Sequence, residues 1–178
     1  MIILVVGGMN SGKSKYAEDI IRTRFSDLRG YYIATMIPYG KFGQEKIAKH
    51  KAMREDIGLE TIEDPYLEHL DEIYELDKEL VNRLTDDSLN KKVILMEDLS
   101  NLIANYMFER KNDYKPTINK LLELGERNEL IIVALRMDEK DESQGYDAAT
   151  IAYIKEMNKE IELISDIADE VVYMNNLE

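Results

Sequence analysis

A short apolar run followed at once by a glycine-rich loop is the feature that most constrains this chain. Ile2 to Val6 form a continuous hydrophobic segment of the kind that becomes a buried parallel strand. The next residues, Gly7 to Ser14, are GGMNSGKS and match the pattern GxxxxGK[ST] without a mismatch. Such a loop turns its backbone N–H groups inward, and the helix that opens near Lys13 adds its positive dipole end. The sequence therefore predicts a site for the phosphates of a nucleoside triphosphate.

Each part of this motif has an expected role. We expect Lys13 to reach the β- and γ-phosphates and Ser14 to supply a hydroxyl to Mg²⁺, which prefers oxygen ligands. The alternative, a glycine-rich turn without a ligand, is disfavoured because both a strand and a helix flank the loop. The predicted phosphate-binding residues are Gly7, Gly8, Met9, Asn10, Ser11, Gly12, Lys13 and Ser14.

Composition narrows the class of protein. The 178 residues suit one nucleotide-binding domain, 1–178, and the absence of cysteine excludes disulfides and fits the reducing cytoplasm. The longest apolar run is the first strand, which is too short for a bilayer and follows no basic segment. We therefore expect a cytoplasmic protein with no membrane span. A net charge of −13 disfavours nucleic acid as a partner, because that affinity comes mostly from Lys and Arg.

Strand-like and helical patterns alternate along the rest of the chain. The clearest later strands are Tyr31 to Thr35, Val93 to Met96, Leu130 to Leu135 and Val171 to Met174. The helical patterns are Lys15 to Arg24, Gln44 to Glu55, Tyr66 to Leu84, Leu99 to Glu109, Pro116 to Glu126 and Asp147 to Ile167. The alternation predicts a three-layer α/β fold of the P-loop NTPase type, with a mostly parallel central sheet covered by helices.

The last of these helices carries one apolar stripe with spacings of three and four. It consists of Ile151, Ile154, Met157, Ile161, Ile164 and Ala168. We interpret this stripe as part of the core or of a subunit interface.

A phosphate-binding loop also needs an acid at the end of a neighbouring strand, where it positions Mg²⁺ directly or through water. The strand Val93 to Met96 leads into Glu97 and Asp98. Glu97 is the preferred metal-side acid and Asp98 is its rival. The alternative is that the pair only caps the helix that begins near Leu99.

A basic segment supplies a second chemical candidate. In a helix, Lys46, His50 and Arg54 would follow one another on one face at i, i+4 spacing. Flanking cations disfavour the imidazolium, so His50 has a reason to stay neutral and nucleophilic near pH 7. The cations would also suit the anionic oxygens of a phosphate under attack. Taken alone, this segment is more typical of a solvated helix face than of a catalytic one.

The order of these motifs resembles one family. GGMNSGKS is followed by YIAT at 32–35, HKAMR at 50–54, TIEDP at 61–65 and ILMEDLSNLIAN at 94–105. In this order the chain resembles the bifunctional adenosylcobinamide kinase and adenosylcobinamide-phosphate guanylyltransferase family of cobalamin biosynthesis. The resemblance covers about the first two-thirds of the chain and returns at its closing helix and strand.

The resemblance implies two linked reactions. A γ-phosphoryl group passes from ATP or GTP to the aminopropanol hydroxyl of adenosylcobinamide. GTP then gives its GMP to that phosphate, which releases pyrophosphate and forms adenosyl-GDP-cobinamide. His50 matches the histidine that carries GMP covalently, and the other implied nucleotide contacts are Thr35, Lys51, Arg54 and Glu63. The resemblance also implies a homotrimer with the corrinoid near a subunit boundary.

The chain departs from the family at two places. Gly40 to Gly43 and Lys46 replace an acidic cluster and an arginine, whose planar fork lysine does not reproduce. The loop 136–146 replaces an Asn-Glu-Val-Gly segment, although a loop at this end of a parallel strand faces the ligand crevice. The simpler interpretation of this loop is a solvated acidic segment, and we expect a structural role for Asn158 and an exposed position for His69.

Two other functions stay open at this point. A kinase or nucleotide hydrolase for another small molecule would use the altered loop as a new pocket and form no covalent nucleotide on His50. A non-catalytic nucleotide-binding regulator would bind the triphosphate without turnover.

Overall fold

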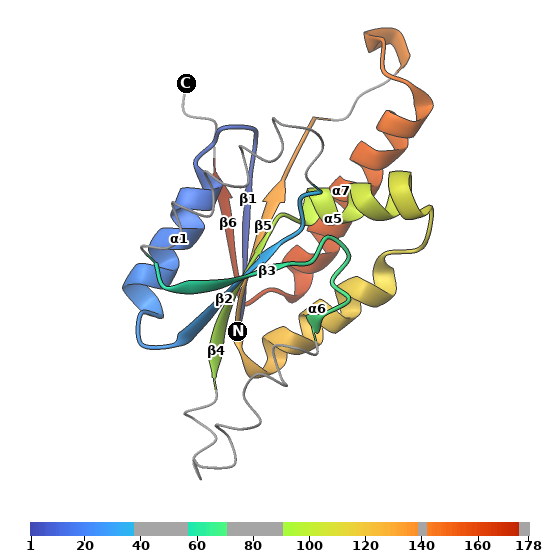
Figure 1. Cartoon of the computed structure of the whole chain (residues 1–178). Helices are drawn as coiled ribbons and strands as arrows, with labels where there is room; N and C mark the ends of the chain where they lie inside the picture. Colours follow the sequence, from blue (N-terminus) through green and yellow to red (C-terminus); the bar gives the residue numbers. More distant parts are fainter. Residues whose placement is uncertain (38–56, 71–90, 139–141, 175–178) are drawn as a thin grey trace.

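Six strands form one sheet, in the order β3-β2-β4-β5-β1-β6, and every pairing is parallel (Figure 1). The computed structural model describes residues 1–37, 57–70, 91–138 and 142–174. The strands are β1 (Ile2–Gly7), β2 (Arg29–Ala34), β3 (Leu59–Glu63), β4 (Lys92–Glu97), β5 (Glu129–Leu135) and β6 (Glu170–Met174). The predicted α/β fold with a central parallel sheet is confirmed.

Helices cover both faces of this sheet. Helix α1 (Lys13–Arg24) lies on one face, and α5 (Leu99–Ala104), α6 (Lys115–Arg127) and α7 (Ala148–Ile167) lie on the other (Figure 1). A π-helical segment, η2 (Asn105–Arg110), continues α5, and a short 3₁₀ helix, η3 (Glu142–Gln144), precedes α7. No helix in the described ranges is long and apolar enough to cross a bilayer.

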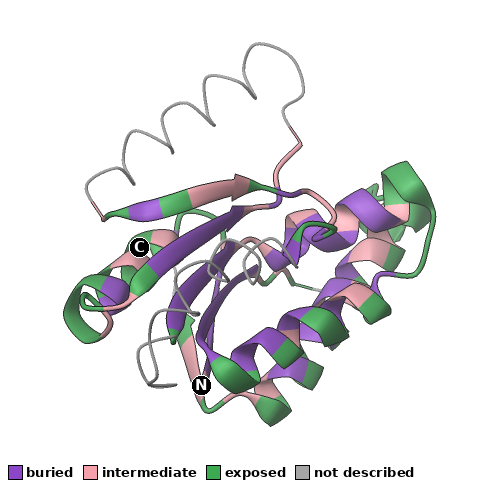
Figure 2. Ribbon diagram, turned by 60° about the horizontal axis from the view of Figure 1, so that its bottom comes forward, coloured by how far each residue is buried: buried purple, intermediate pink, exposed green. Residues whose placement is uncertain are grey.

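Side-chain alternation along β1 divides the core between the two faces. Ile3 and Val5 pack with residues of α1, whereas Leu4 and Val6 pack with residues of α5, α6 and α7. Figure 2 shows the buried residues in the strands and on the inner sides of the helices. Because β1 is buried on both faces, its sequence is a continuous apolar run rather than an alternating one.

The predicted apolar stripe of the last helix belongs to the core within this chain. Ile154, Met157, Ile161 and Ile164 of α7 are all at most 1% exposed. Asp147 caps this helix, because its carboxylate accepts the backbone N–H of Thr150 at 2.8 Å.

The segment after β3 departs from the prediction. A helix was expected from Tyr66, but residues 66–69 are not helical and the first described helical residue is Leu70. The buried carboxylate of Asp64 accepts the N–H groups of Glu68 and His69 at 3.0 and 2.6 Å, and Leu67 has a left-handed φ of 53°. These local hydrogen bonds hold a turn where side-chain periodicity alone predicts helix. The expected helix Gln44 to Glu55 lies outside the described residues.

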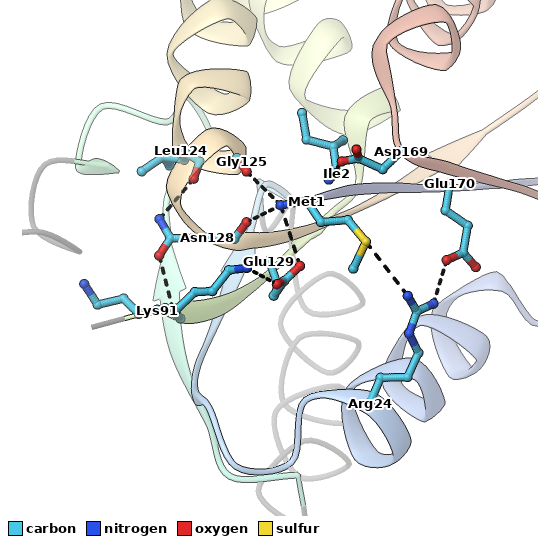
Figure 3. A network of polar contacts seen from close by, with 11 residues as sticks. Met1, Ile2, Arg24, Lys91, Leu124, Gly125, Asn128, Glu129, Asp169 and Glu170 are labelled. Carbon is cyan, nitrogen blue, oxygen red and sulfur yellow. Dashed lines mark hydrogen bonds and ion pairs between the residues drawn. The ribbon is translucent and has the colours of Figure 1, made fainter. Parts of the chain in front are cut away.

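The amino ends of β1, β4, β5 and β6 meet in a polar network (Figure 3). The ammonium group of Met1 donates to the backbone oxygens of Gly125 and Asn128 at 3.0 and 2.8 Å and lies 3.6 Å from Glu129. The N–H of Ile2 donates to Asp169 at 2.7 Å. These contacts fix the start of β1 against the carboxyl ends of α6 and α7. The position of β1 along the strand direction is therefore set, and with it the position of the loop that follows β1.

A buried acid lies between α6 and α7. Glu160 is 5% exposed, and the hydroxyl of Tyr114 donates to Glu160 and Glu156 at 3.3 and 3.0 Å. Burial raises the pKa of Glu160 above its usual value of 4.5, although the Tyr114 hydrogen bond acts in the opposite direction. The protonated form is therefore favoured in the folded protein relative to the unfolded chain.

The substitution Glu160→Gln should stabilise the protein at neutral pH. The folded carboxyl holds its proton to a higher pH than the unfolded one, so this group costs stability as pH rises above about 4.5. Glutamine keeps an acceptor for Tyr114 without the charge. We expect the melting temperature to rise by a few degrees at pH 7.5, with the gain closing as pH falls toward 4. Exposed Glu162 on the same helix provides the control, and a gain independent of pH would contradict the assignment.

Candidate nucleotide site

The loop between β1 and α1 has the backbone of a phosphate cradle. Gly12 is the residue before α1 and has a left-handed φ of 82°, and Asn10 also has a positive φ of 60°. The N–H of Ser11 donates to Gly8 O at 3.4 Å and closes the turn. Gly12 has no side chain and therefore offers no side-chain cap to the first N–H groups of α1. This is the arrangement that binds an anion at a helix N-terminus.

Close packing explains the first glycine of the motif. A Cβ atom on Gly7 would lie 3.0 Å from Met174 Cβ and 3.1 Å from Ser11 Cβ. The Ser11 side chain is fully buried, and among the described residues its hydroxyl has no hydrogen-bond partner. The loop is therefore held tightly against the end of β6.

The side chains of Lys13 and Ser14 have different hydrogen-bond partners. The Lys13 ammonium donates to Gly8 O at 3.2 Å, so the side chain folds back along the loop. The Ser14 hydroxyl donates to the Glu97 carboxylate, which lies at the end of β4. A hydroxyl and a carboxylate from residues far apart in sequence thus meet beside the first turn of α1.

Glu97 receives a second hydrogen bond from a residue that sequence analysis missed. The hydroxyl of Tyr32, on β2, donates to the other carboxylate oxygen of Glu97 at 3.2 Å. Glu97 is therefore held from both sides, with one oxygen toward Ser14 and the other toward Tyr32. Tyr32 lies in the YIAT motif, but nothing in that motif indicates that the Tyr32 hydroxyl reaches Glu97.

Asp98 has a different local role. Its carboxylate accepts the N–H of Asn101 at 2.7 Å and the hydroxyl of Ser100 at 2.8 Å, so it caps α5. Burial raises the pKa of Asp98 above its usual value, and the hydrogen bonds from Asn101 and Ser100 partly oppose that shift. The peptide bond between Glu97 and Asp98 is cis. The helix-capping alternative thus describes Asp98, whereas Glu97 faces the loop.

Thr35 ties the end of β2 to this acidic pair. Its fully buried side chain accepts the N–H of Asp98 and donates to Asp98 O, both at 2.8 Å, while its own N–H donates to Glu97 O at 3.1 Å. The amide of Asn105 then donates to Thr35 O and Pro65 O, both at 2.8 Å. Asn105, in the motif at 94–105, is a second residue whose positioning role the sequence did not indicate.

The remaining predicted residues divide into those near the site and those not described. Glu63 ends β3 opposite Ala34, and Met9 is 70% exposed in the loop. His50, Lys51 and Arg54 lie outside the described residues. Asn158 has the structural role expected, because its amide donates to Met137 O at 2.8 Å. His69 is exposed, as predicted, and its ring nitrogen lies 3.5 Å from Asp64.

The fold and this loop define the class of protein. A parallel sheet with a GxxxxGKS loop after β1 and an acid at the end of β4 is the arrangement of a P-loop nucleotide-binding protein. The family model described as "Cobinamide kinase / cobinamide phosphate guanyltransferase" matches residues 3–176, and the chain belongs to this family. Its members are kinase and guanylyltransferase enzymes of cobalamin biosynthesis that use nucleoside triphosphates.

A solved structure shares the fold. The KaiC-like protein PH0186 from the hyperthermophilic archaeon Pyrococcus horikoshii OT3 superposes with a TM-score of 0.52 and 14% sequence identity. The match covers 99% of this chain and 74% of that one. Comparison with curated protein sequences finds no significant match. At this identity the likeness concerns the fold alone.

The two neighbouring acids should differ in their effect on stability. Asp98→Ala removes the cap of α5 and should lower the free energy of unfolding by about 1 kcal/mol, whereas Asp98→Asn keeps a capping oxygen and should retain most of it. Glu97→Gln keeps an acceptor for Ser14 or Tyr32, and we expect a change within about 0.5 kcal/mol. Urea denaturation followed by circular dichroism measures all three. Equal losses for Asp98→Ala and Asp98→Asn would argue against the cap.

Proposed function

We propose that this chain binds Mg²⁺ and a nucleoside triphosphate at the loop Gly7 to Ser14 and carries out both reactions of its family there and at His50. It phosphorylates adenosylcobinamide with ATP or GTP, and it transfers GMP from GTP to the resulting phosphate. The observation that carries the proposal is the Ser14–Glu97 hydrogen bond, which joins the phosphate loop to a strand-end acid.

The donor set at this point fits Mg²⁺. The Ser14 hydroxyl and the Glu97 carboxylate are hard oxygen ligands already in contact with each other. In the described ranges no three His, Cys, Asp or Glu residues gather as a metal-binding group. Mg²⁺ does not need one, because it commonly takes one or two protein oxygens together with substrate phosphates and water. When bound, the ion would neutralise charge on the phosphates.

In the kinase reaction the chain acts mainly by positioning and charge. Lys13 would leave Gly8 O and reach the β- and γ-phosphates, and the N–H groups at the start of α1 would hold their oxygens. The γ-phosphoryl group moves to the substrate hydroxyl, the bond to the β-phosphate oxygen breaks, and the hydroxyl proton is lost to an acceptor. Tyr32 would hold Glu97 in place without touching the substrate.

In the guanylyl transfer we assign the covalent step to His50. A neutral ring nitrogen attacks the α-phosphorus of GTP, a P–N bond forms, and pyrophosphate leaves. A phosphate oxygen of the corrinoid then attacks the same phosphorus, the P–N bond breaks, and His50 is regenerated. Lys51, Arg54, Thr35 and Glu63 complete the proposed nucleotide contacts.

The metal-side acid can be tested against its neighbour. Glu97→Gln should lower kcat for phosphorylation of adenosylcobinamide by at least about 100-fold, because it removes the charge that we assign to the metal. Asp98→Asn should stay within a few-fold of wild type, since its carboxylate faces α5. The assay is steady-state phosphorylation with ATP and Mg²⁺. A larger loss in Asp98→Asn than in Glu97→Gln would reverse the assignment.

The covalent step predicts a labelled protein. With Mg²⁺ and GTP labelled at the α-phosphate, we expect acid-labile, alkali-stable label on the chain. The label should disappear in His50→Ala and persist in His69→Ala, and these are the two histidines of the chain. Label that survives in His50→Ala, or none in a wild-type protein that binds GTP, would remove the guanylyl-histidine from the proposal.

The assembly and location follow from the family resemblance. We propose a homotrimer of a single nucleotide-binding domain, 1–178, located in the cytoplasm where its nucleotide substrates occur, with the corrinoid near a subunit boundary. The predicted stripe on α7 supplies core rather than interface. Light scattering should give three times the chain mass of 20.7 kDa.

A further inference from the structure

A pocket of about 210 Å³ lies at the amino edge of the sheet, between the end of α1 and the starts of β2 and β3. The phosphate loop lies at the opposite edge, where β1 ends and α1 begins (Figure 1). The 12 residues of α1 rise by about 1.5 Å each, so about 18 Å of helix separates the two places. The pocket is therefore distinct from the nucleotide site.

The walls of the pocket are mainly apolar side chains that belong to the core on the α1 face of the sheet. Ile21 of α1 and Leu59 of β3 are buried. Phe25, Leu28 and Ile57 are half-buried and pack against the same core cluster. Water beside such side chains finds few hydrogen-bond partners, so its replacement by an apolar group is favourable.

Two glycines contribute backbone rather than side chains to the lining of the pocket. Gly30 begins β2, and the Leu59 side chain lies directly over it, because a Cβ on Gly30 would be 2.1 Å from Leu59 Cδ2. Gly58 precedes β3 and has a left-handed φ of 72°. A ligand in the pocket would therefore change the surroundings of two glycine amides.

Arg22 is the only charged residue among the described residues that line the pocket. Its neighbours in sequence are neutralised by ion pairs. Arg24 lies 2.6 Å from Glu170, and Arg29 lies 3.2 Å from Glu60. No carboxylate in the described ranges pairs with Arg22 in this way. The end of α1 carries only about half a negative charge, so the pocket keeps a net positive charge although the chain carries −13.

We infer that this pocket binds a small carboxylate with an apolar body, the carboxylate at Arg22 and the body between Ile21 and Leu59. Ser26 adds a hydroxyl donor to the lining. A water molecule takes about 30 Å³ of liquid, so the volume suits a ligand of about seven to nine non-hydrogen atoms. Hexanoate is a probe of this size. The inference goes beyond the proposed function and needs neither nucleotide nor metal.

Titration of ¹⁵N-labelled protein with hexanoate tests the site by nuclear magnetic resonance. We expect the amide signals of Gly30 and Gly58 to shift with a dissociation constant of about 1 mM, typical of so small a ligand, while Gly12 in the phosphate loop stays unchanged. Arg22→Gln should weaken this binding by about 5- to 10-fold. Arg127→Gln, which changes an exposed arginine in the last turn of α6, is the matched control and should bind like wild type.

Two further probes separate the charge of the ligand from its apolar body. Hexylamine keeps the body with the opposite charge, and acetate keeps the charge without the body, so neither should shift Gly30 or Gly58. A spectrum otherwise like that of wild type shows that Arg22→Gln is folded.

Several results would overturn the inference. They are equal binding of hexanoate and hexylamine, equal affinity of wild type and Arg22→Gln for hexanoate, and no shift at Gly30 or Gly58. Shifts confined to Gly12 would place the anion at the phosphate loop and would also overturn it. Because no nucleotide is present in the titration, failure of the proposed function would leave this result unaffected.

Discussion

The hydrogen bond between Ser14 and Glu97 connects two parts of the sheet that are not neighbours. Ser14 lies on the helix that follows β1, and Glu97 ends β4, with β5 between the two strands. The contact therefore requires that the carboxyl ends of β1, β5 and β4 lie level with one another at one edge of the sheet. The parallel register of these strands provides this alignment. Tyr32 and Thr35 extend this dependence to β2. A displacement of any of these strands would separate the loop from its acid.

Adjacent carboxyl groups serve different purposes because their surroundings differ. Asp98 caps a helix and is buried, and its burial raises its pKa although the capping hydrogen bonds partly oppose that shift. Glu97 accepts hydroxyl donors from two elements beside the phosphate loop. Glu97 faces the phosphate loop, and the next residue, Asp98, faces the start of α5. The two neighbouring acids therefore do not both point at the same ligand.

Sequence patterns were sufficient for five of the six strands and for the loop, but not for β3 or for the contacts around the site. The apolar run Ile2 to Val6 and the glycine spacing locate the loop because local chemistry determines both. By contrast, β3 is a short edge strand with exposed polar residues and lacks a strong strand pattern. The turn at Leu67 depends on the Asp64 carboxylate, which helical periodicity does not register. Tyr32 and Asn105 act through tertiary hydrogen bonds, which no spacing in one sequence reveals.

The position of β1 in the sheet has a consequence for how the protein is made. The first strand pairs with β5 and β6, so its partners are synthesised more than a hundred residues later. Pairings of such separation carry a large loop-closure cost and slow the folding of a chain. During translation the phosphate loop leaves the ribosome well before β6, the strand against which it packs. A ribosome-bound chain that ends before Glu170 would carry the nucleotide motif without the completed site.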